Sequence, residues 1–549
     1  MVSASRIGLR TILLAATALT AISVPACAAD AGGQAATNAR IEALEQQIQD
    51  LSSQVQDLKR STSDQYADTQ NQQAQAPKPK VDNGRLSISS ADGKFTAAVR
   101  GLAQLDWGAY GQNKSAATYP AAYGPNLSSG TNFRRVYLGV QGRIFGDWSY
   151  NLNFDFGGSG GTETPGHVQS VYLEYDGLAP FALRAGAFPP PANLEDATSA
   201  GDTIFLERNA PSDLQRNIAG GDGRDAVSLL YLGDQLFGAV SYTGAKVQDS
   251  AVFGEQQAVV GRASYLFKLG EDAKLVVGGN GLYVFQLPNS VARGSAIGAV
   301  TPGAAALNTI TLSDPPELTI DSQGLKLVNT ASIAANHIRQ WGVETAAAWQ
   351  NLYAQAGYYD FEIDRAPTAF KVFTSAVASH TQIVQPLNDS FSGWYLQGTW
   401  VLTGERRTYN TATGAFTAPK PAEPFNIDGS GWGAFELAGR FSDLDLNDHV
   451  SDASNVVTAF TGPATKTYSF FNTVRGGDQK IWTAAFNWYP NSVVKLELQY
   501  QFIDVSRLQS GATPSTVIVS APTTGAAVLP ALSASQDIQT IAARVQLSL

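Results

Sequence analysis

Hydrophobic and polar residues alternate one by one through residues 133–156, FRRVYLGVQGRIFGDWSYNLNFDF. This repeat of two predicts β-strands, because successive side chains point to opposite faces of a strand. One face of each strand is apolar and the other is polar and often charged, as in a hairpin between lipid and water. The apolar faces carry Val136, Leu138 and Val140 in the first strand, and Trp148, Tyr150, Leu152, Phe154 and Phe156 in the second.

The same pattern recurs along most of the chain after residue 85. Alternating runs also lie at 95–107, 170–175, 181–187, 225–232, 235–243, 257–268, 273–286, 339–349, 351–363, 391–403, 431–443, 479–489, 493–505 and 537–549. Tight turns alternate with long connections, and this parity predicts an all-β fold with sixteen antiparallel strands closed into a transmembrane barrel. Residues 404–430 are the exception, because they are long where a short turn is expected.

Residues 1–28 predict a secretory signal peptide, because Arg6 and Arg10 precede an apolar core that is too short to span a bilayer. A small-residue cleavage site, Ala26-Cys27-Ala28, follows it. A lipoprotein signal around Cys27 is an alternative, although Pro25 fits that motif poorly. Removal of the leader would leave no cysteine, so we expect no disulfide and no Cys-ligated metal.

Residues 29–62 predict a short helix that forms a coiled coil, because apolar residues repeat at a spacing of three and four. The repeat consists of Ile41, Leu44, Ile48, Leu51, Val55 and Leu58. An amphipathic helix that lies on the barrel is the alternative. Residues 63–84, rich in Gln, Ser and Pro, predict a linker, and residues 85–549 the barrel.

Composition agrees with a barrel. Charged residues make up 15% of the chain, the 549 residues include 52 glycines, and the mean hydropathy is -0.10. Alternation hides the hydrophobicity of a barrel, whereas a helical membrane protein would be more apolar on average. The net charge of -10 becomes about -12 without Arg6 and Arg10, and this disfavours nucleic acid as a partner.

Several segments resemble the phosphate-selective porin O and P family. They include LAQLDW, the 133–156 hairpin, VYLEYDGLAPFALRAGAFPPPANLEDATSAGDTIFLER, WGVETAAAW, GWGAFELAGRFSDLDL and QKIWTAAFNWYPNSVVKLELQYQF. The resemblance covers roughly residues 85–549 and implies a trimeric, sixteen-stranded outer-membrane anion channel. It also implies that loop 188–224 folds into the lumen and forms the constriction.

The chain departs from the family pattern in two places. Loop 188–224 contains no lysine, and it carries Glu195, Asp196, Asp202 and Glu207 beside Arg208, Arg216 and Arg224. The last residue is Leu549, where family members usually end in an aromatic residue. The resemblance therefore supports the fold of this chain better than it supports specificity for phosphate.

A pore selects ions by the charges at its narrow part. Strand parity and the loop predict pore-lining, anion-binding arginines at Arg100, Arg135, Arg143, Arg184, Arg208 and Arg262, with Arg440 and Arg544 on the same side. The constriction residues are Glu195, Asp196, Glu207 and Arg208. Acidic residues share the lumen face, so two interpretations stay open: an anion-favouring cluster, or Arg–carboxylate pairs that only stiffen the wall.

Enzyme signals are weak. Gly157 to Gly161 satisfies G-x-S-x-G, but it opens a glycine-rich loop and not the strand-turn-helix that a nucleophile needs. The four histidines have no metal-ligand spacing, so we expect no cofactor.

We therefore predict a passive outer-membrane porin for small anions such as phosphate, with its coiled coil in the periplasm and lipid around the barrel. The alternatives are a weakly selective general porin and an envelope-tethering barrel. The coiled-coil residues favour a dimer and the resemblance a homotrimer, and we prefer the trimer because the zipper is short.

Overall fold

The computed structural model describes residues 33–549 except 83, 114–125, 159–164, 250–253, 289–307, 374–378, 451–455, 463–464, 471, 508–516 and 519–533. The chain divides into two compact units, residues 1–76 and residues 77–549. The predicted signal peptide and the serine of the G-x-S-x-G motif lie outside the described residues.

The first unit contains one long helix, α1 (Gly33–Gln75). It continues well past residue 62 into the segment that we assigned to a linker. Residues 61–76 contain neither Gly nor Pro and are rich in Gln and Ala, which are good helix formers, and Pro77 prevents continuation. The apolar stripe from Ile41 to Leu58 is exposed along its whole length.

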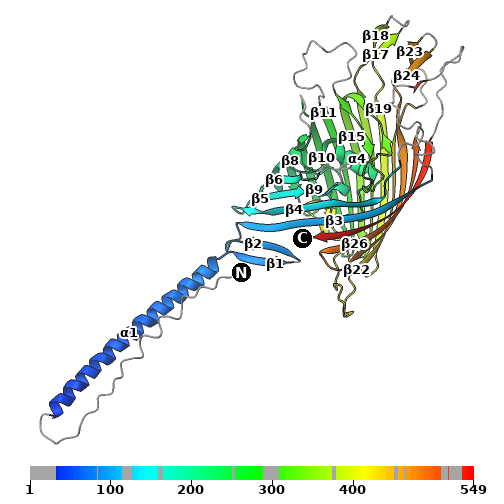
Figure 1. Ribbon diagram of the computed structural model, residues 1–549. Helices are drawn as coiled ribbons and strands as arrows, with labels where there is room; N and C mark the ends of the chain where they lie inside the picture. Colours follow the sequence, from blue (N-terminus) through cyan, green and yellow to red (C-terminus); the bar gives the residue numbers. More distant parts are fainter. Residues whose placement is uncertain are drawn as a thin grey trace. The chain divides into compact units, whose positions relative to one another are not determined.

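The second unit is a closed barrel of sixteen antiparallel strands, which confirms the predicted strand number (Figure 1). The last strand pairs with the first, for example Arg544 with Asp106, so the sheet has no free edge. The barrel strands are β3 (Thr96–Gln112), β4 (Gly130–Ile144), β5 (Trp148–Asp155), β6 (His167–Leu178), β7 (Phe181–Ala187), β8 (Arg224–Leu232), β9 (Leu236–Lys246), β10 (Gln257–Leu269), β11 (Ala273–Gln286), β15 (Ile333–Trp349), β16 (Leu352–Arg365), β19 (Asp389–Val401), β22 (Ala434–Asp448), β25 (Val474–Tyr489), β26 (Val494–Arg507) and β28 (Ala534–Ser548).

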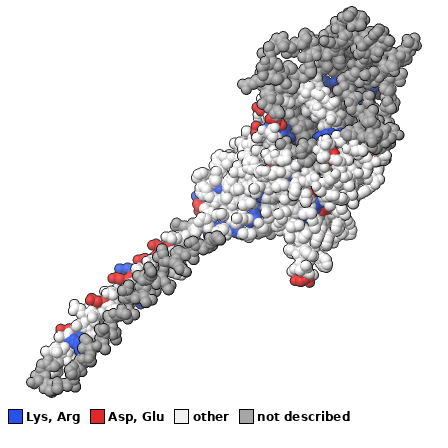
Figure 2. Space-filling view, in the orientation of Figure 1, with Lys and Arg blue, Asp and Glu red and all other residues white. Residues whose placement is uncertain are grey.

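Burial alternates along these strands and separates an apolar outer face from a lumen face. In β10, Val259 and Tyr265 are exposed whereas Val260 and Arg262 are buried. The outer surface in Figure 2 carries few charged residues over the barrel wall. Outer aromatic rings follow one another across neighbouring strands, as in a membrane girdle. One such series contains Trp394, Phe441, Trp482 and Phe502, with ring centroids 4.9–5.8 Å apart.

The two ends of the barrel differ. One end, which we call the turn end, has short connections such as residues 145–147, 233–235 and 350–351. The other end, the loop end, has the long connections. The predicted exception, a long connection at residues 404–430 where a short turn is expected, is confirmed. Residues 402–433 separate β19 from β22 at the turn end.

Smaller elements lie before the barrel and in its connections. Strand β1 (Lys78–Asp82) lies in the predicted linker and forms a hairpin with β2 (Arg85–Ser89), which begins the predicted barrel segment and pairs with the beginning of β3. The others are α3 (Leu194–Ala197), α4 (Ala210–Ala219), β12 (Thr309–Ile310), β13 (Ser313–Asp314), β14 (Val328–Asn329), β17 (Thr368–Phe373), β18 (Ser379–Val384), β20 (Tyr409–Asn410), β21 (Ala415–Phe416), β23 (Val456–Gly462), β24 (Thr465–Phe470) and β27 (Val517–Ile518).

Among the described residues, three connections pack buried side chains against the lumen face: residues 188–223 and 308–332 from the loop end, and residues 402–422 from the turn end. Asn209 caps the N-terminus of helix α4, because its side chain accepts a hydrogen bond from Ser212 N at 3.0 Å. Its residues Leu214 and Ile218 pack in an apolar cluster with Tyr359 and Tyr395 of the wall. Each such buried aliphatic side chain contributes about 1.5–3 kcal/mol, so this cluster holds α4 inside the barrel.

Candidate functional site

Four buried arginines of the lumen, three on the wall and Arg407 on segment 402–422, are paired with carboxylates. Arg262 Nε lies 2.6 Å from Glu344 Oε1, and Arg407 Nη2 lies 2.7 Å from Glu436 Oε1. Arg544 forms two hydrogen bonds of 2.6 Å with Asp106, and Arg440 pairs with Glu317. All eight side chains are buried. A buried pair of this kind satisfies its own charges and has little left for a solute.

These pairs also attach the inserted segments to the wall. Glu344 accepts a hydrogen bond from Leu194 N at 2.8 Å, and Arg544 donates one to Leu206 O at 2.7 Å. Arg262 donates to the backbone oxygens of Thr413 and Gly414, each at 2.8 Å. The wall pairs therefore position segments 188–223 and 402–422.

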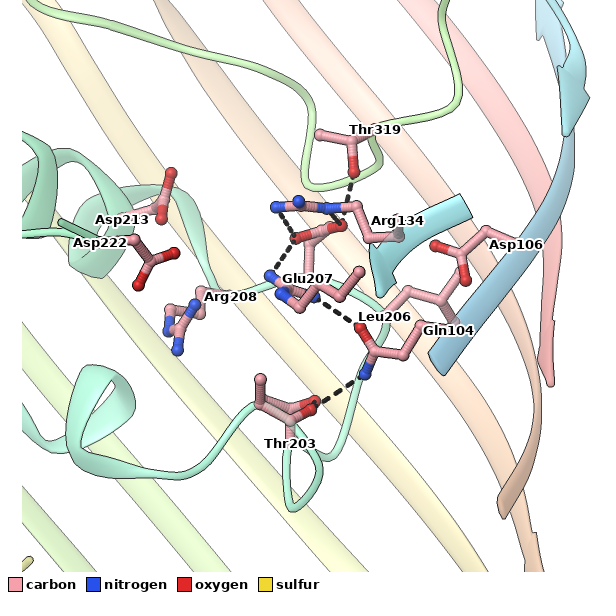
Figure 3. A network of polar contacts seen from close by, with 12 residues as sticks. Gln104, Asp106, Arg134, Thr203, Leu206, Glu207, Arg208, Asp213, Asp222 and Thr319 are labelled. Atoms are coloured by element: carbon pink, nitrogen blue, oxygen red, sulfur yellow. Dashed lines mark hydrogen bonds and ion pairs between the residues drawn. The ribbon is translucent and has the colours of Figure 1, made fainter. Parts of the chain in front are cut away.

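Glu207 lies at the centre of a cluster of guanidinium groups (Figure 3). Its carboxylate is 2.5 Å from Arg134 Nε, 3.4 Å from Arg135 Nη2 and 3.8 Å from Arg544 Nη2, and it accepts a 2.5 Å hydrogen bond from Thr319. Burial opposes ionisation, but the three guanidinium groups outweigh it and hold the pKa of Glu207 below its ordinary value. One carboxylate thus fixes three arginines.

A polar cavity of about 350 Å³ opens beside this cluster, and we call it the loop-end cavity. Six cationic side chains and two carboxylates line it: Arg134, Arg135, Arg208, Arg216, Lys246 and Lys326, with Asp213 and Asp222. Figure 3 shows Asp213, Asp222 and Arg208 together on one side of Glu207. Burial opposes ionisation of Asp222, yet Arg216 at 2.7 Å and other arginines lower the pKa of Asp222. This lowered pKa favours the ionised form of Asp222, and the cationic side chains of the lining outnumber its carboxylates.

A second cavity, of about 520 Å³, lies at the turn end. Its charged lining consists of Lys80, Arg85, Lys420, Lys495 and Asp202, with the C-terminal residue Leu549. We call it the turn-end cavity. It is lined by residues from the β1–β2 hairpin and from inserted segments 188–223 and 402–422. Both cavities therefore carry more cationic than acidic side chains.

The predicted arginines occupy different environments. Arg135 and Arg208 line the loop-end cavity, and Arg262 is fully buried against Glu344. Arg184 pairs with Glu174 at 2.6 Å, and the exposed Arg143 pairs with Asp176 at 2.6 Å. Half-buried Arg100 has no ion pair with any carboxylate that the structure describes.

The predicted constriction residues all lie within the barrel. Glu195 accepts hydrogen bonds from Gln355 at 2.8 Å and Gln397 at 3.0 Å. Asp196 accepts one from Arg216 at 2.5 Å and lies 3.8 Å from Arg208. Asp196 and Glu207 thus hold arginines of the loop-end cavity, whereas Glu195 contacts neutral amides.

Strand parity missed Arg134. Strict alternation from Leu138 puts Arg134 on the lipid face, but the β3–β4 register shifts between Gln104 and Leu105. This bulge turns both Arg134 and Arg135 into the lumen, where both are buried. The sequence did contain a signal for this bulge: two adjacent arginines, one of which strict alternation would expose to lipid. Lys246 and Lys326 were also missed, because nothing in the sequence brings them to one cavity.

In the described part of the chain, no group of three or more His, Cys, Asp or Glu side chains could hold a metal ion. None of the described helices combines the length and apolar character that a membrane span requires.

Comparison with known proteins identifies the family. The chain is 25% identical to Porin O of Pseudomonas aeruginosa over 421 residues, which cover 76% of this chain and 85% of the relative. It is 24% identical to an uncharacterized protein of Caulobacter vibrioides over 452 residues, or 80% and 74% of the two chains. Among solved structures, an anion-selective porin from Comamonas acidovorans is 9% identical, with a TM-score of 0.39 over 83% of this chain and 100% of that one. The family model for phosphate-selective porin O and P matches residues 109–527, and the chain therefore belongs to the phosphate-selective porin O and P family.

Proposed function

We propose that this porin conducts small anions, with phosphate among them, by passive diffusion across the outer membrane. The observation that carries the proposal is the loop-end cavity, where six cationic side chains face two carboxylates. Guanidinium and ammonium groups both bind phosphate and carboxylate anions. A row of weak sites, and not one tight site, permits an anion to enter and to leave.

The orientation of the barrel follows from its connections. Short turns face the periplasm and long loops face outward in outer-membrane barrels. Anions from outside would therefore meet the loop-end cavity first and the turn-end cavity second. The turn-end cavity offers Lys80, Arg85, Lys420 and Lys495 on that side of the barrel.

The exposed stripe of α1 supports self-association. Apolar side chains at 41, 44, 48, 51, 55 and 58 stay exposed in the single chain, and a coiled coil would bury them against copies of themselves. We propose a homotrimer with this coiled coil in the periplasm. Crosslinking of the full-length protein, with and without residues 41–58, tests both the number of copies and the role of the helix.

A weakly selective porin is the competing function, and one observation favours it. The wall pairs neutralise Arg262, Arg407, Arg440 and Arg544, so charge selection depends on the cavity residues alone.

Reversal potentials in planar bilayers under a KCl gradient separate the two functions. Anion conduction predicts a reversal potential that is shifted toward the chloride equilibrium potential. It also predicts that added phosphate reduces the chloride current. A reversal potential near zero without phosphate block would support the weakly selective porin, and a cation-selective potential would refute the anion channel.

A further inference from the structure

A row of side chains across four neighbouring strands has members in the linings of both cavities. The register pairs Gln104 of β3 with Arg135 of β4 on one side and with Gln546 of β28 on the other. Gln546 in turn pairs with Lys495 of β26. Arg135 lines the loop-end cavity, whereas Gln546 and Lys495 line the turn-end cavity. Gln104 lies between them and is completely buried.

Hydrogen bonds join the members of this row. Gln104 Oε1 accepts from Arg135 Nη1 at 2.9 Å, and Gln104 Nε2 donates to Gln546 Oε1 at 2.7 Å. The Gln104 amide therefore links a residue of one cavity to a residue of the other. Figure 3 shows Gln104 between the arginines at Glu207 and the chain segment that bears Thr203.

Residues 199–203 of the inserted segment, which we call the inner turn, lie against this row. Three of their carbonyl oxygens accept hydrogen bonds from it: Ala200 O from Gln104 at 3.0 Å, Gly201 O from Gln546 at 2.8 Å, and Thr203 O from Lys495 at 2.8 Å. The opposite side of the turn is attached to segment 402–422 by a 3.1 Å bond from Ala418 N to Asp202. The inner turn is thus held by side-chain donors at the boundary of the two cavities.

We infer that anions cross from one cavity to the other at Gln104, and that they do so by displacing the inner turn. This inference rests on the proposed anion conduction. The donors that hold the turn are two amide groups and the Lys495 ammonium, which also lies 2.7 Å from Glu497 Oε2. All three can donate hydrogen bonds to an anion. An anion that leaves Arg135 competes with the carbonyls of Ala200, Gly201 and Thr203 for these donors. A cation cannot accept a hydrogen bond from these donors, so it does not compete with the carbonyl oxygens and does not displace the turn.

The first experiment is a pair of conservative variants in planar bilayers. Q104L keeps the volume of the side chain but removes its donor and acceptor, so the displaced turn becomes roughly fivefold more populated for each hydrogen bond lost. We expect a higher open probability and a higher chloride conductance. Q340L is the matched control, because Gln340 is a buried lumen amide that accepts a hydrogen bond from Gln215 at 3.2 Å, donates one to Asn280 at 3.0 Å and lines neither cavity. Its conductance should equal that of the unchanged channel.

The second experiment measures movement of the turn. Cys27 is the only cysteine of the chain, so A200C in a C27S background gives a single thiol on the inner turn. We expect phosphate to accelerate its reaction with an uncharged methanethiosulfonate reagent, which does not compete with phosphate for the cationic side chains, and we expect the reaction to reduce the current. A412C, at an exposed position in the turn between β20 and β21, should react at a rate that phosphate does not accelerate.

The outcomes separate this inference from the proposed function. If the unchanged channel is anion-selective but Q104L conducts as before and phosphate leaves the A200C rate unaltered, the crossing point is elsewhere and the inference is wrong. If the unchanged channel is not anion-selective, the proposed function itself fails. Heat-dependent migration on gels verifies that each variant still forms the barrel.

Discussion

The lumen has two halves that differ in what fills them. Against β10, β16 and β19 it is filled by apolar side chains, with α4 packed on Val260, Tyr359 and Tyr395. Against β3, β4 and β28 it is filled by charged and amide side chains and holds the boundary between two cavities. Helix α4 borders both halves, since Leu214 packs in the apolar cluster and Asp213 lines the loop-end cavity.

The two halves therefore have different roles, one in positioning the inserted segments and the other in contacting the solute. The apolar half has the packing of a protein core and determines where the inserted segments lie. The polar half keeps hydratable space and carries the charges that a solute would meet. If so, substitutions in the first half should change stability, and substitutions in the second half should change selectivity.

The largest expected effect is loss of the pair that anchors segment 402–422. R262A removes the partner of Glu344 and leaves a buried, unpaired carboxylate, which costs about 3–5 kcal/mol. The barrel should unfold at a lower temperature in heat-dependent gel migration. R262M/E344L, which removes both charges, should recover most of the stability. An equal loss in both variants would contradict the explanation by an unpaired charge.

A cavity residue tests the opposite half. Lys326 lines the loop-end cavity and its side chain is exposed, so K326M should leave stability unchanged. Removal of one charge about 4 Å from a bound anion in water costs about 1 kcal/mol, or roughly fivefold in the phosphate concentration that reduces the current. K268M, the same change at an exposed residue outside both cavities, should have no effect. Equal effects of both variants would show that general surface charge is responsible.

The pH dependence of stability sharpens the comparison at Glu195. Burial raises the pKa of Glu195 above its ordinary value, against the opposing influence of Arg440 and Arg208. The folded chain then binds this proton more tightly than the unfolded chain. Stability should fall as the pH rises from the unfolded pKa through the folded one, and should then stay level. E195Q should remove this loss and be more stable than the unchanged chain at neutral pH, but not below about pH 4. A constant difference at every pH would refute a role for ionisation.

The smallest effect belongs to the turn end of the wall. Arg143 and Asp176 are 2.6 Å apart, but the Arg143 side chain is 48% exposed, so solvent screens the pair. R143A should change stability by less than about 1 kcal/mol and leave the reversal potential unaltered. A clear change of selectivity would show that the path reaches this arginine.

The number of strands, and the face of the sheet on which most side chains lie, could be predicted because both depend on local alternation. Each strand shows its own pattern, and Arg262 and Arg544 face the lumen as parity requires. Loop insertion at 188–223 was implied by resemblance alone. Insertion of residues 308–332 had no such signal, although Glu317 from that segment pairs with Arg440.

Ion-pair partners could not be predicted. Arg262 and Glu344 are 82 residues apart and belong to strands that are not neighbours in the sheet. Their contact depends on the closed, staggered barrel and on where the inserted segments leave space. Of the two interpretations of the lumen arginines, pairing describes the wall. The arginines of the loop-end cavity lie together but are also paired with Glu207, Asp196 and Asp222, and their preference for anions stays a prediction.

The bulge at Arg134 and Arg135 shows how such a pore could change during evolution. One additional residue in β4 puts both Arg134 and Arg135 on the lumen face, while the pairing of β28 with β3 continues without a register shift. Insertions and deletions of one residue are usually regarded as damage to a β-sheet. In a channel wall they are also a route by which a lineage can acquire or lose a fixed charge in a single mutational step, without any substitution of the residues already facing the solute.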